Sequence, residues 1–193
     1  MLFRSNDDLL HTGPAPDLSV VVIGRNEGER LRRCLASVAA ADWGDLRHEV
    51  LYVDSRSTDG SVGLALARGA RCVVLADERP CAAKARNLGW RHARGALVLF
   101  LDGDTELHPD FVGHALRALS APEVCAVWGH RRESRPGQSI YTRLLDLDWL
   151  YRPGRVAYFG GDVLMRRAAL EAVGGFDPAL GAGEEPEIGR AHV

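Results

Sequence analysis

Short apolar runs rich in β-branched residues alternate, in the first half of the chain, with longer segments whose apolar residues recur at helical spacing. Four such runs, at residues 18–23, 50–53, 72–75 and 96–101, predict β-strands. Each run is apolar throughout, which is typical of strands buried on both faces of a parallel sheet with right-handed helical crossovers. The pattern therefore predicts an α/β fold with a mostly parallel sheet flanked by helices.

The segments between these runs carry the signals of helices. Leu31, Leu35 and Val38 recur at spacings of four and three, which puts them on one face of a helix that begins near Glu29. Three further helices are predicted after Gly60, over residues 81–93 and after Pro109.

From about residue 125 the pattern becomes less regular. We expect a short strand that ends at Gly129, a helix over residues 140–150 and a glycine-rich stretch over 160–183. At 193 residues the chain fits a single domain with a substantial core. One functional site is therefore expected.

Polar residues cluster where three of the predicted strands end. These clusters lie at residues 24–27, 54–57 and 102–104. In open parallel sheets, ligands bind at the carboxyl ends of the strands. The three clusters should therefore meet at one edge of the sheet and form a binding site there.

The sequence Asp102-Gly103-Asp104 follows the most apolar of these strands. Two carboxylates separated by one glycine repel each other, unless a hard cation lies between them and an oxygen-rich ligand. A Mg²⁺ or Mn²⁺ ion held here would neutralise a diphosphate and act as a Lewis acid. The glycine would let phosphates approach the backbone. The alternative is a simple polar turn, since Asp and Gly are common turn residues.

Charge and composition exclude several other classes of partner. A net charge of −2 and a pI near 6.4 give no global reason to expect nucleic acid. The arginines within residues 131–135 are interpreted as a solvated surface, with contact to nucleic acid as the alternative. The four cysteines lack Cys-x-x-Cys spacing and are interpreted as buried structural thiols in a reducing compartment. Because no apolar stretch approaches about 20 residues, we expect a cytoplasmic domain without a membrane span.

Three other enzyme classes with a similar architecture fit the sequence less well. A haloacid dehalogenase-type phosphatase would need Thr or Val where Glu106 stands. The turn at residues 24–28 does not match the Gly-x-Gly-x-x-Gly fingerprint of a dinucleotide-binding dehydrogenase. A nucleotidyltransferase typically has a lysine in this turn, which is absent here, yet it stays as the alternative enzyme class.

Taken together, the motifs resemble those of the family 2 glycosyltransferases, in the same order across nearly the whole chain. They are residues 18–27, 53–60, 85–89, 100–104, 160–167, 173–177 and 183–185. The resemblance implies a GT-A fold, a nucleotide-diphosphate sugar as donor and inversion at the anomeric carbon. It also implies a hydroxyl acceptor on a glycan or lipid-linked molecule, as in polysaccharide, glycolipid or cell-envelope glycan synthesis.

The resemblance also implies roles for individual residues. Asp104 would ligate the metal directly and Asp102 would lie near both the metal and the ribose. The other expected donor-binding residues are Asn26 and Glu27 beside the nucleoside, Asp54 at the base, and Arg86 and Asn87 near the donor. Many members have two aspartates where this chain has Asp54-Ser55, so the base contact could come from either position or from the backbone. The alternative for Arg86 is a surface salt bridge.

Two further groups concern the acceptor. The family's acidic motif matches Glu184-Glu185, and Glu185 is expected to be the catalytic base, with Glu184 as the second candidate. The alternative is that both acids begin a helix, where they favour the helix dipole. The aromatic residues Trp149, Tyr151 and Tyr158 could stack on the acceptor, although core packing is the favoured interpretation.

The resemblance divides the chain into an N-terminal extension (1–17) and a catalytic domain (18–186), with a donor-binding half at about 18–124 and an acceptor-side half at about 125–186. Residues 187–193 are expected to be a non-native tail translated from a sequencing adapter, which would leave the fold truncated at its C-terminus. The full-length protein could then associate with the cytoplasmic face of a membrane. The non-enzyme alternative is an inactive fragment that binds nucleotide-sugars.

Overall fold

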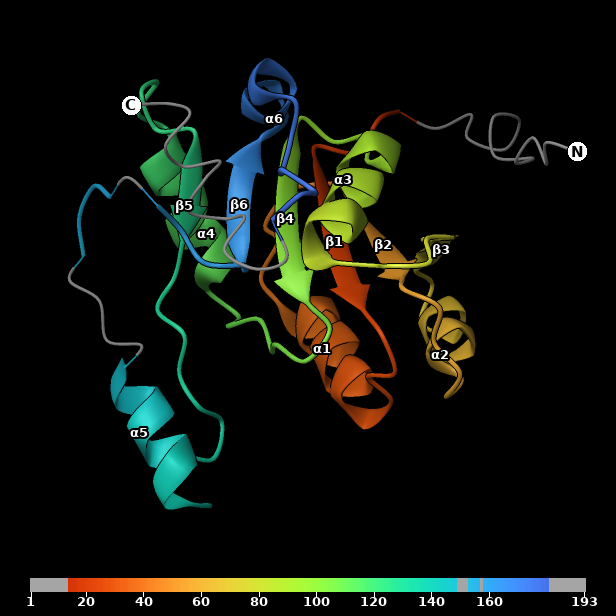
Figure 1. The fold of residues 1–193 in the computed structure, drawn as a ribbon. Coiled ribbons are helices and arrows are strands. Elements are labelled where there is room, and N and C mark those ends of the chain that lie inside the picture. The colour runs from red at the N-terminus through yellow and green to blue at the C-terminus, as the bar shows by residue number, and fades with distance from the viewer. Residues whose placement is uncertain (1–13, 149–152, 157, 181–193) are drawn as a thin grey trace, which may run out of the picture.

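The computed structural model describes residues 14–148, 153–156 and 158–180. A six-stranded sheet in the order β3-β2-β1-β4-β6-β5 forms the centre of the domain (Figure 1). The strands are β1 (Leu18–Gly24), β2 (His48–Asp54), β3 (Arg71–Val74), β4 (Leu97–Asp102), β5 (Ala126–Trp128) and β6 (Val163–Arg166). The helices are α1 (Glu29–Ala40), α2 (Ser61–Ala67), α3 (Ala82–His92), α4 (Phe111–Leu119), α5 (Ile140–Asp148) and α6 (Arg167–Val173).

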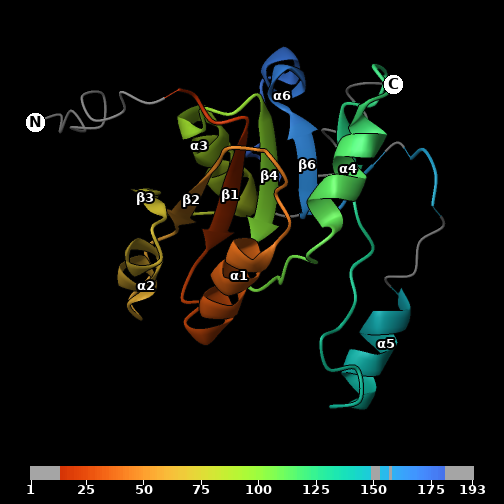
Figure 2. The same ribbon diagram turned by 180° about the vertical axis from the view of Figure 1, so that it is seen from behind.

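Helices cover both faces of the sheet, which confirms the predicted α/β class. Alternate residues of each strand point to opposite faces, so Val20 and Val22 pack beneath α1, α2 and α4, while Val21 and Ile23 pack beneath α3 and α6 (Figure 2). α3 lies so close to β1 that a side chain on Gly89 would overlap Val21. The four strands expected from the apolar runs all form, and each begins within two residues of its predicted first residue.

The second half of the sheet differs from the sequence-based expectation. β6 pairs antiparallel with both β4 and β5, and it lies between them. The sequence pattern indicated only a glycine-rich stretch here, because the apolar part of β6 is only three residues long. β6 places the segment before it directly beside the end of β4.

α5 lies apart from the sheet in both views (Figures 1 and 2). Its apolar side chains are exposed, with Tyr141 at 76% and Ile140 at 64%. A bidentate ion pair from Arg132 to Asp146, at 2.7 Å for each contact, connects it to the segment after β5. None of the helices in the described part of the chain is both long and apolar enough to cross a bilayer.

The cysteines match their expected role only in part. All four are free thiols, but Cys34 alone is fully buried. Burial raises the pKa of the Cys34 thiol well above its ordinary value, and nearby carboxylates add to the shift. Cys81 instead lies at the start of α3, where it lines a pocket.

Candidate functional site

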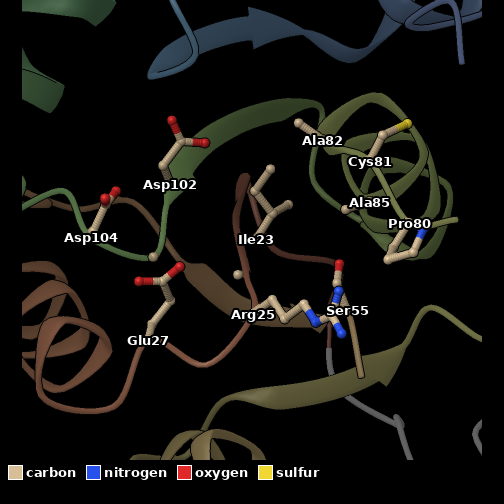
Figure 3. Close-up of a pocket in the computed structure, with 12 residues that line it drawn as sticks. Ile23, Arg25, Glu27, Ser55, Pro80, Cys81, Ala82, Ala85, Asp102 and Asp104 are labelled. Carbon is tan, nitrogen blue, oxygen red and sulfur yellow. The ribbon is translucent and has the colours of Figure 1, made fainter. Parts of the chain in front are cut away.

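A pocket of about 370 Å³ opens at the carboxyl ends of β1, β2 and β4 (Figure 3). Its volume lies within the range of small-molecule sites, about 300–1,000 Å³. The lining residues come from the three strand ends and the start of α3: Ile23, Gly24, Arg25, Glu27, Ser55, Pro80, Cys81, Ala82, Ala85, Asp102, Gly103 and Asp104. The polar clusters at residues 24–27, 54–57 and 102–104 therefore meet at one edge of the sheet, as predicted.

Asn26 joins two of the loops that surround the pocket. Its Oδ1 accepts a hydrogen bond from the Thr58 backbone N–H at 2.7 Å, and its own N–H donates to Ser57 Oγ at 2.8 Å. Asn26 has a left-handed φ of 57°, a conformation that asparagine tolerates better than most residues. Arg56 in the neighbouring loop also has a left-handed φ, of 65°. Backbone strain of this kind is common at functional sites.

Asp54 is buried at the end of β2, and both of its oxygens accept hydrogen bonds from the protein. Oδ1 accepts from the Tyr52 hydroxyl at 3.1 Å, and Oδ2 accepts from the Ser57 N–H at 2.8 Å. Burial, together with the negative charge of Asp54, raises the pKa of Tyr52 above its ordinary range. Ser55, rather than Asp54, lines the pocket. Asp54 is thus placed to fix the conformation of the loop that carries Ser55.

Three carboxylates, from Glu27, Asp102 and Asp104, form one side of the pocket (Figure 3). The pKa of Glu27 is raised chiefly by burial, Arg30 opposes the shift, and the negative charges of Asp104 and Asp102 add to it. Gly103 allows this close approach, because a Cβ there would lie 3.0 Å from Glu27 Cγ. The pocket therefore has an acidic wall of three carboxylates, of which Glu27 is paired with Arg30 at 2.9 Å.

Both carboxylate oxygens of Asp102 are held by arginines. Arg86 Nη2 donates to Oδ1 at 2.8 Å, and Arg131 Nη2 donates to Oδ2 at 3.1 Å. The Arg86 side chain is only 2% exposed. The alternative of a surface salt bridge for Arg86 is therefore wrong, because its guanidinium is buried and reaches Asp102 from within the protein.

Asp162 supports this arrangement from the turn before β6. Its Oδ1 accepts from the Asp102 backbone N–H at 3.0 Å, and its Oδ2 accepts from the Thr105 hydroxyl at 3.1 Å and from Arg131 Nε at 2.9 Å. Burial raises the pKa of Asp162, with a further increase from the charge of Asp102 that Arg131 opposes. Arg131 therefore bridges two carboxylates.

Asn87 lies outside the pocket lining, one residue from Arg86 on α3. Its Nδ2 donates to the Phe176 carbonyl at 2.7 Å, and its Oδ1 accepts from the Phe176 N–H at 2.9 Å and from Trp90 Nε1 at 3.0 Å. These bonds hold the turn after α6 against α3. In this structure the Asn87 amide contacts protein groups, and its predicted contact with a donor stays a prediction.

The side chains that line the acidic wall suit a hard cation only in part. Among the described residues, no group of three or more His, Cys, Asp or Glu side chains is arranged to hold a metal ion. Asp104 is exposed on the acidic wall, whereas both oxygens of Asp102 accept from arginines. Glu27 offers a further oxygen ligand on the same wall. Carboxylates of this kind are the ligands that Mg²⁺ and Mn²⁺ prefer, so a cation here would rely on Asp104 and on oxygens of a bound ligand.

Several predicted residues lie elsewhere. Glu184, Glu185, Trp149 and Tyr151 fall outside the described residues. Tyr158 is 46% exposed, with its ring centroid 6.4 Å from that of Trp128. Core packing is therefore wrong for Tyr158, because it lies at the surface.

Sequence reasoning missed Arg131 and Asp162. The interpretation of residues 131–135 as a solvated surface is wrong for Arg131, whose side chain is only 33% exposed and which pairs with two carboxylates. A weak signal existed for Asp162, since an aspartate that directly precedes the apolar run Val163-Leu164-Met165 needs a partner when the run is buried.

The profile of a known protein family, described as Glycosyl transferase family 2, matches residues 19–174. The chain belongs to this family. The match covers all of the pocket and the Arg131 and Asp162 segments. Glycosyltransferase AglE from Haloferax volcanii is 31% identical over 123 residues, which cover 62% of this chain and 40% of AglE.

Solved structures show the same GT-A fold. The mannosyltransferase PcManGT from Pyrobaculum calidifontis, in complex with GDP-Man and Mn²⁺, is 26% identical with a TM-score of 0.68, and the match covers 91% of this chain and 51% of that protein. S. aureus TarS in complex with UDP has a TM-score of 0.71 at 19% identity, over 90% of this chain and 54% of that protein. The chain thus spans about half of these structures and less of AglE.

Proposed function

We propose that this chain is the donor-binding part of a glycosyltransferase that transfers a sugar from a nucleotide-diphosphate donor to a hydroxyl acceptor. The observation that carries the proposal is the pocket at the carboxyl ends of β1, β2 and β4, which has an acidic wall in a member of glycosyl transferase family 2. The nucleotide-sugar and Mn²⁺ bound by PcManGT support a donor of this chemical class.

The two sides of the pocket suit different parts of such a donor. Pro80, Ala82 and Ala85 give a wall of small, mostly apolar side chains, which suits the flat face of a nucleoside. Glu27, Asp102 and Asp104 line the other side of the pocket, where they would face the diphosphate of a bound donor. Asn26 and Asp54 support the nucleoside side through the loops that they hold. Arg86 supports the acidic side from α3, and Asn87, the next residue on that helix, is the further residue proposed to lie near the donor.

Asp104 is the residue that would hold a divalent cation, with Asp102 beside it and Glu27 as a further oxygen ligand. When bound, the cation supplies Lewis-acid stabilisation of the negative charge on the departing diphosphate. The arginines on Asp102 keep its carboxylate in a fixed position, and Asp104 lacks such a pair among the described contacts.

The acceptor-side half, residues 125–186, would complete the reaction. Glu185, or Glu184 in its place, would take the proton from the acceptor hydroxyl as the acceptor oxygen forms its bond to the anomeric carbon. The bond from that carbon to the diphosphate oxygen breaks, and the nucleoside diphosphate leaves with the electron pair. Attack from the face opposite the leaving group inverts the anomeric carbon. The acceptor is a hydroxyl of a glycan or a lipid-linked molecule.

A thermal-shift experiment tests the donor site, because a ligand that binds only the folded state raises the melting temperature. UDP-N-acetylglucosamine, GDP-mannose and UDP are each added with Mn²⁺ or with EDTA. At least one should stabilise the chain with Mn²⁺ and much less with EDTA. Asp104→Ala should remove the Mn²⁺-dependent part of the shift.

Asp45→Ala is the matched control, since Asp45 is an exposed aspartate in the α1–β2 loop at the opposite end of the sheet. It should behave as the wild type. Donor shifts that are equal with Mn²⁺ and EDTA, or that survive Asp104→Ala, would contradict the assignment of the metal site. Release of pyrophosphate, rather than transfer of a sugar, would indicate a nucleotidyltransferase.

A further inference from the structure

Three segments that are distant in sequence from Asp102 reach it. It ends β4, Arg86 reaches it from α3, Arg131 from the segment after β5, and Asp162 from the turn before β6. Figure 1 shows how β6 places these last two segments beside the end of β4. Asp102 also lines the pocket (Figure 3).

The guanidinium of Arg131 forms a rigid bridge between the two carboxylates. Its Nε donates to Asp162 at 2.9 Å, and its Nη2 donates to Asp102 at 3.1 Å. Because a guanidinium is planar, fixing Nε on one partner also fixes the direction of Nη2 toward the other. Asp162 in turn is fixed by the Asp102 N–H and by Thr105. The carboxylate of Asp102 therefore has one orientation.

The energetics favour a functional purpose for this cluster. Asp162 is 15% exposed and Arg86 is 2% exposed, so both charges lose most of their contact with water. Removing charges from water costs several kcal/mol per ion, and apolar replacements of buried ion pairs are often neutral or stabilising. The apolar layers on both faces of the sheet already supply the packing. We therefore explain the buried charges of Arg86 and Asp162 by the fixed orientation that they give to the Asp102 side chain at the pocket wall.

We propose that Arg131 and Asp162 are positioning residues that hold the Asp102 carboxylate against the pocket. By occupying Asp102 Oδ2, Arg131 leaves Asp104 as the carboxylate of the pair that is open to a cation. This inference rests on the proposed function, since it assigns a purpose to Asp102 within the donor site. Arg131 acts through Asp102 and makes no contact with the donor of its own.

A double-mutant cycle tests whether Arg131 acts through Asp102. Mn²⁺-dependent binding of the best-binding probe among UDP, UDP-N-acetylglucosamine and GDP-mannose is measured by calorimetry for the wild type, Arg131→Met, Asp102→Asn and the double variant. Arg131→Met should weaken binding by about 10- to 100-fold, the usual effect of losing a supporting group in the outer shell of a metal site. In the Asp102→Asn background the same change should cost less than about twofold, because the group that it orients has already lost its charge.

Arg132→Met is the matched control. Arg132 neighbours Arg131 and makes a bidentate ion pair with Asp146, but it is 62% exposed and faces α5. It should bind the probe as the wild type does. Arg131→Lys keeps the charge without the planar fork, so it should fold as the wild type and still bind the probe more weakly. If Arg131→Met does not fold, Arg131→Lys takes its place in the cycle.

The outcomes separate the two proposals. Equal losses from the Arg131 variant in both backgrounds, or no loss in either, would overturn the positioning role while leaving the donor site intact. If the wild type binds none of the probes with Mn²⁺, the proposed function itself fails and this inference fails with it.

Discussion

Gly161→Ala should disrupt the cluster around Asp102 by steric overlap alone. A Cβ at this position would lie 2.5 Å from Arg86 Nη2, 2.9 Å from Asp102 Oδ2 and 3.0 Å from Arg131 Nη2. These atoms belong to three charged groups that already hold one another, so none can move without lengthening an ion pair. Gly161 does not have a left-handed φ, so the substitution adds no backbone strain of that kind.

Overpacking of this kind typically costs about 1–3 kcal/mol. We therefore expect Gly161→Ala to lower the free energy of unfolding by that amount, measured by urea denaturation with tryptophan fluorescence. The melting temperature should fall by about 2–4 °C per kcal/mol for a domain of this size. Mn²⁺-dependent donor binding should weaken as well, because the Asp102 carboxylate must shift to make room.

Gly160→Ala provides the matched control one residue away. A Cβ there would meet only the Trp128 ring, at 3.6 Å, which is ordinary van der Waals contact. It should change the free energy of unfolding by less than about 0.5 kcal/mol, as most uncrowded substitutions do. Equal unfolding free energies and equal donor affinities for the two variants would refute the close packing described around Asp102.

Two further predictions concern other parts of the chain. The Glu49 side chain is 8% exposed and accepts hydrogen bonds from Ser19, Arg71 and Arg94. Burial raises the pKa of Glu49, but the hydrogen bonds outweigh burial and hold the pKa below its ordinary value. The contribution of Glu49 to stability is therefore present above about pH 4.5 and is lost as the pH falls through the lowered pKa. Glu49→Gln should therefore cost about 1.5–3 kcal/mol at pH 7, the range for hydrogen bonds to charged groups, and progressively less below pH 4.5 in urea titrations; a pH-independent loss would contradict the ion-pair explanation. Glu185→Gln should spare donor binding and lower sugar transfer by at least about 100-fold, as loss of a general base does, whereas undiminished transfer would move that role to Glu184.

The sequence by itself determined the layers of the domain and the edge at which the pocket lies. Continuous apolar runs such as that of β1 are stable only when both faces of the strand are covered, so they predict a parallel sheet between helices. The spacing of Leu31, Leu35 and Val38 fixes which face of α1 is buried. Because parallel strands end at a common edge, Glu27, Asp102 and Asp104 could be placed in one site before any contact was known.

Only the tertiary structure decided which charges meet at that site. Periodicity reports burial along a single element, but the pairing of Asp102 with Arg131 and Asp162 depends on segments 29 and 60 residues away. Those segments meet because β6 lies antiparallel between β4 and β5. The order of the strands in the sheet depends on tertiary pairing and cannot be read from the local pattern of apolar residues. Asn87 likewise meets Phe176 only because α6 and the turn after it fold back over α3. The sequence shows which side chains are polar, but the packing of distant elements determines which partner forms a hydrogen bond or ion pair with each of them.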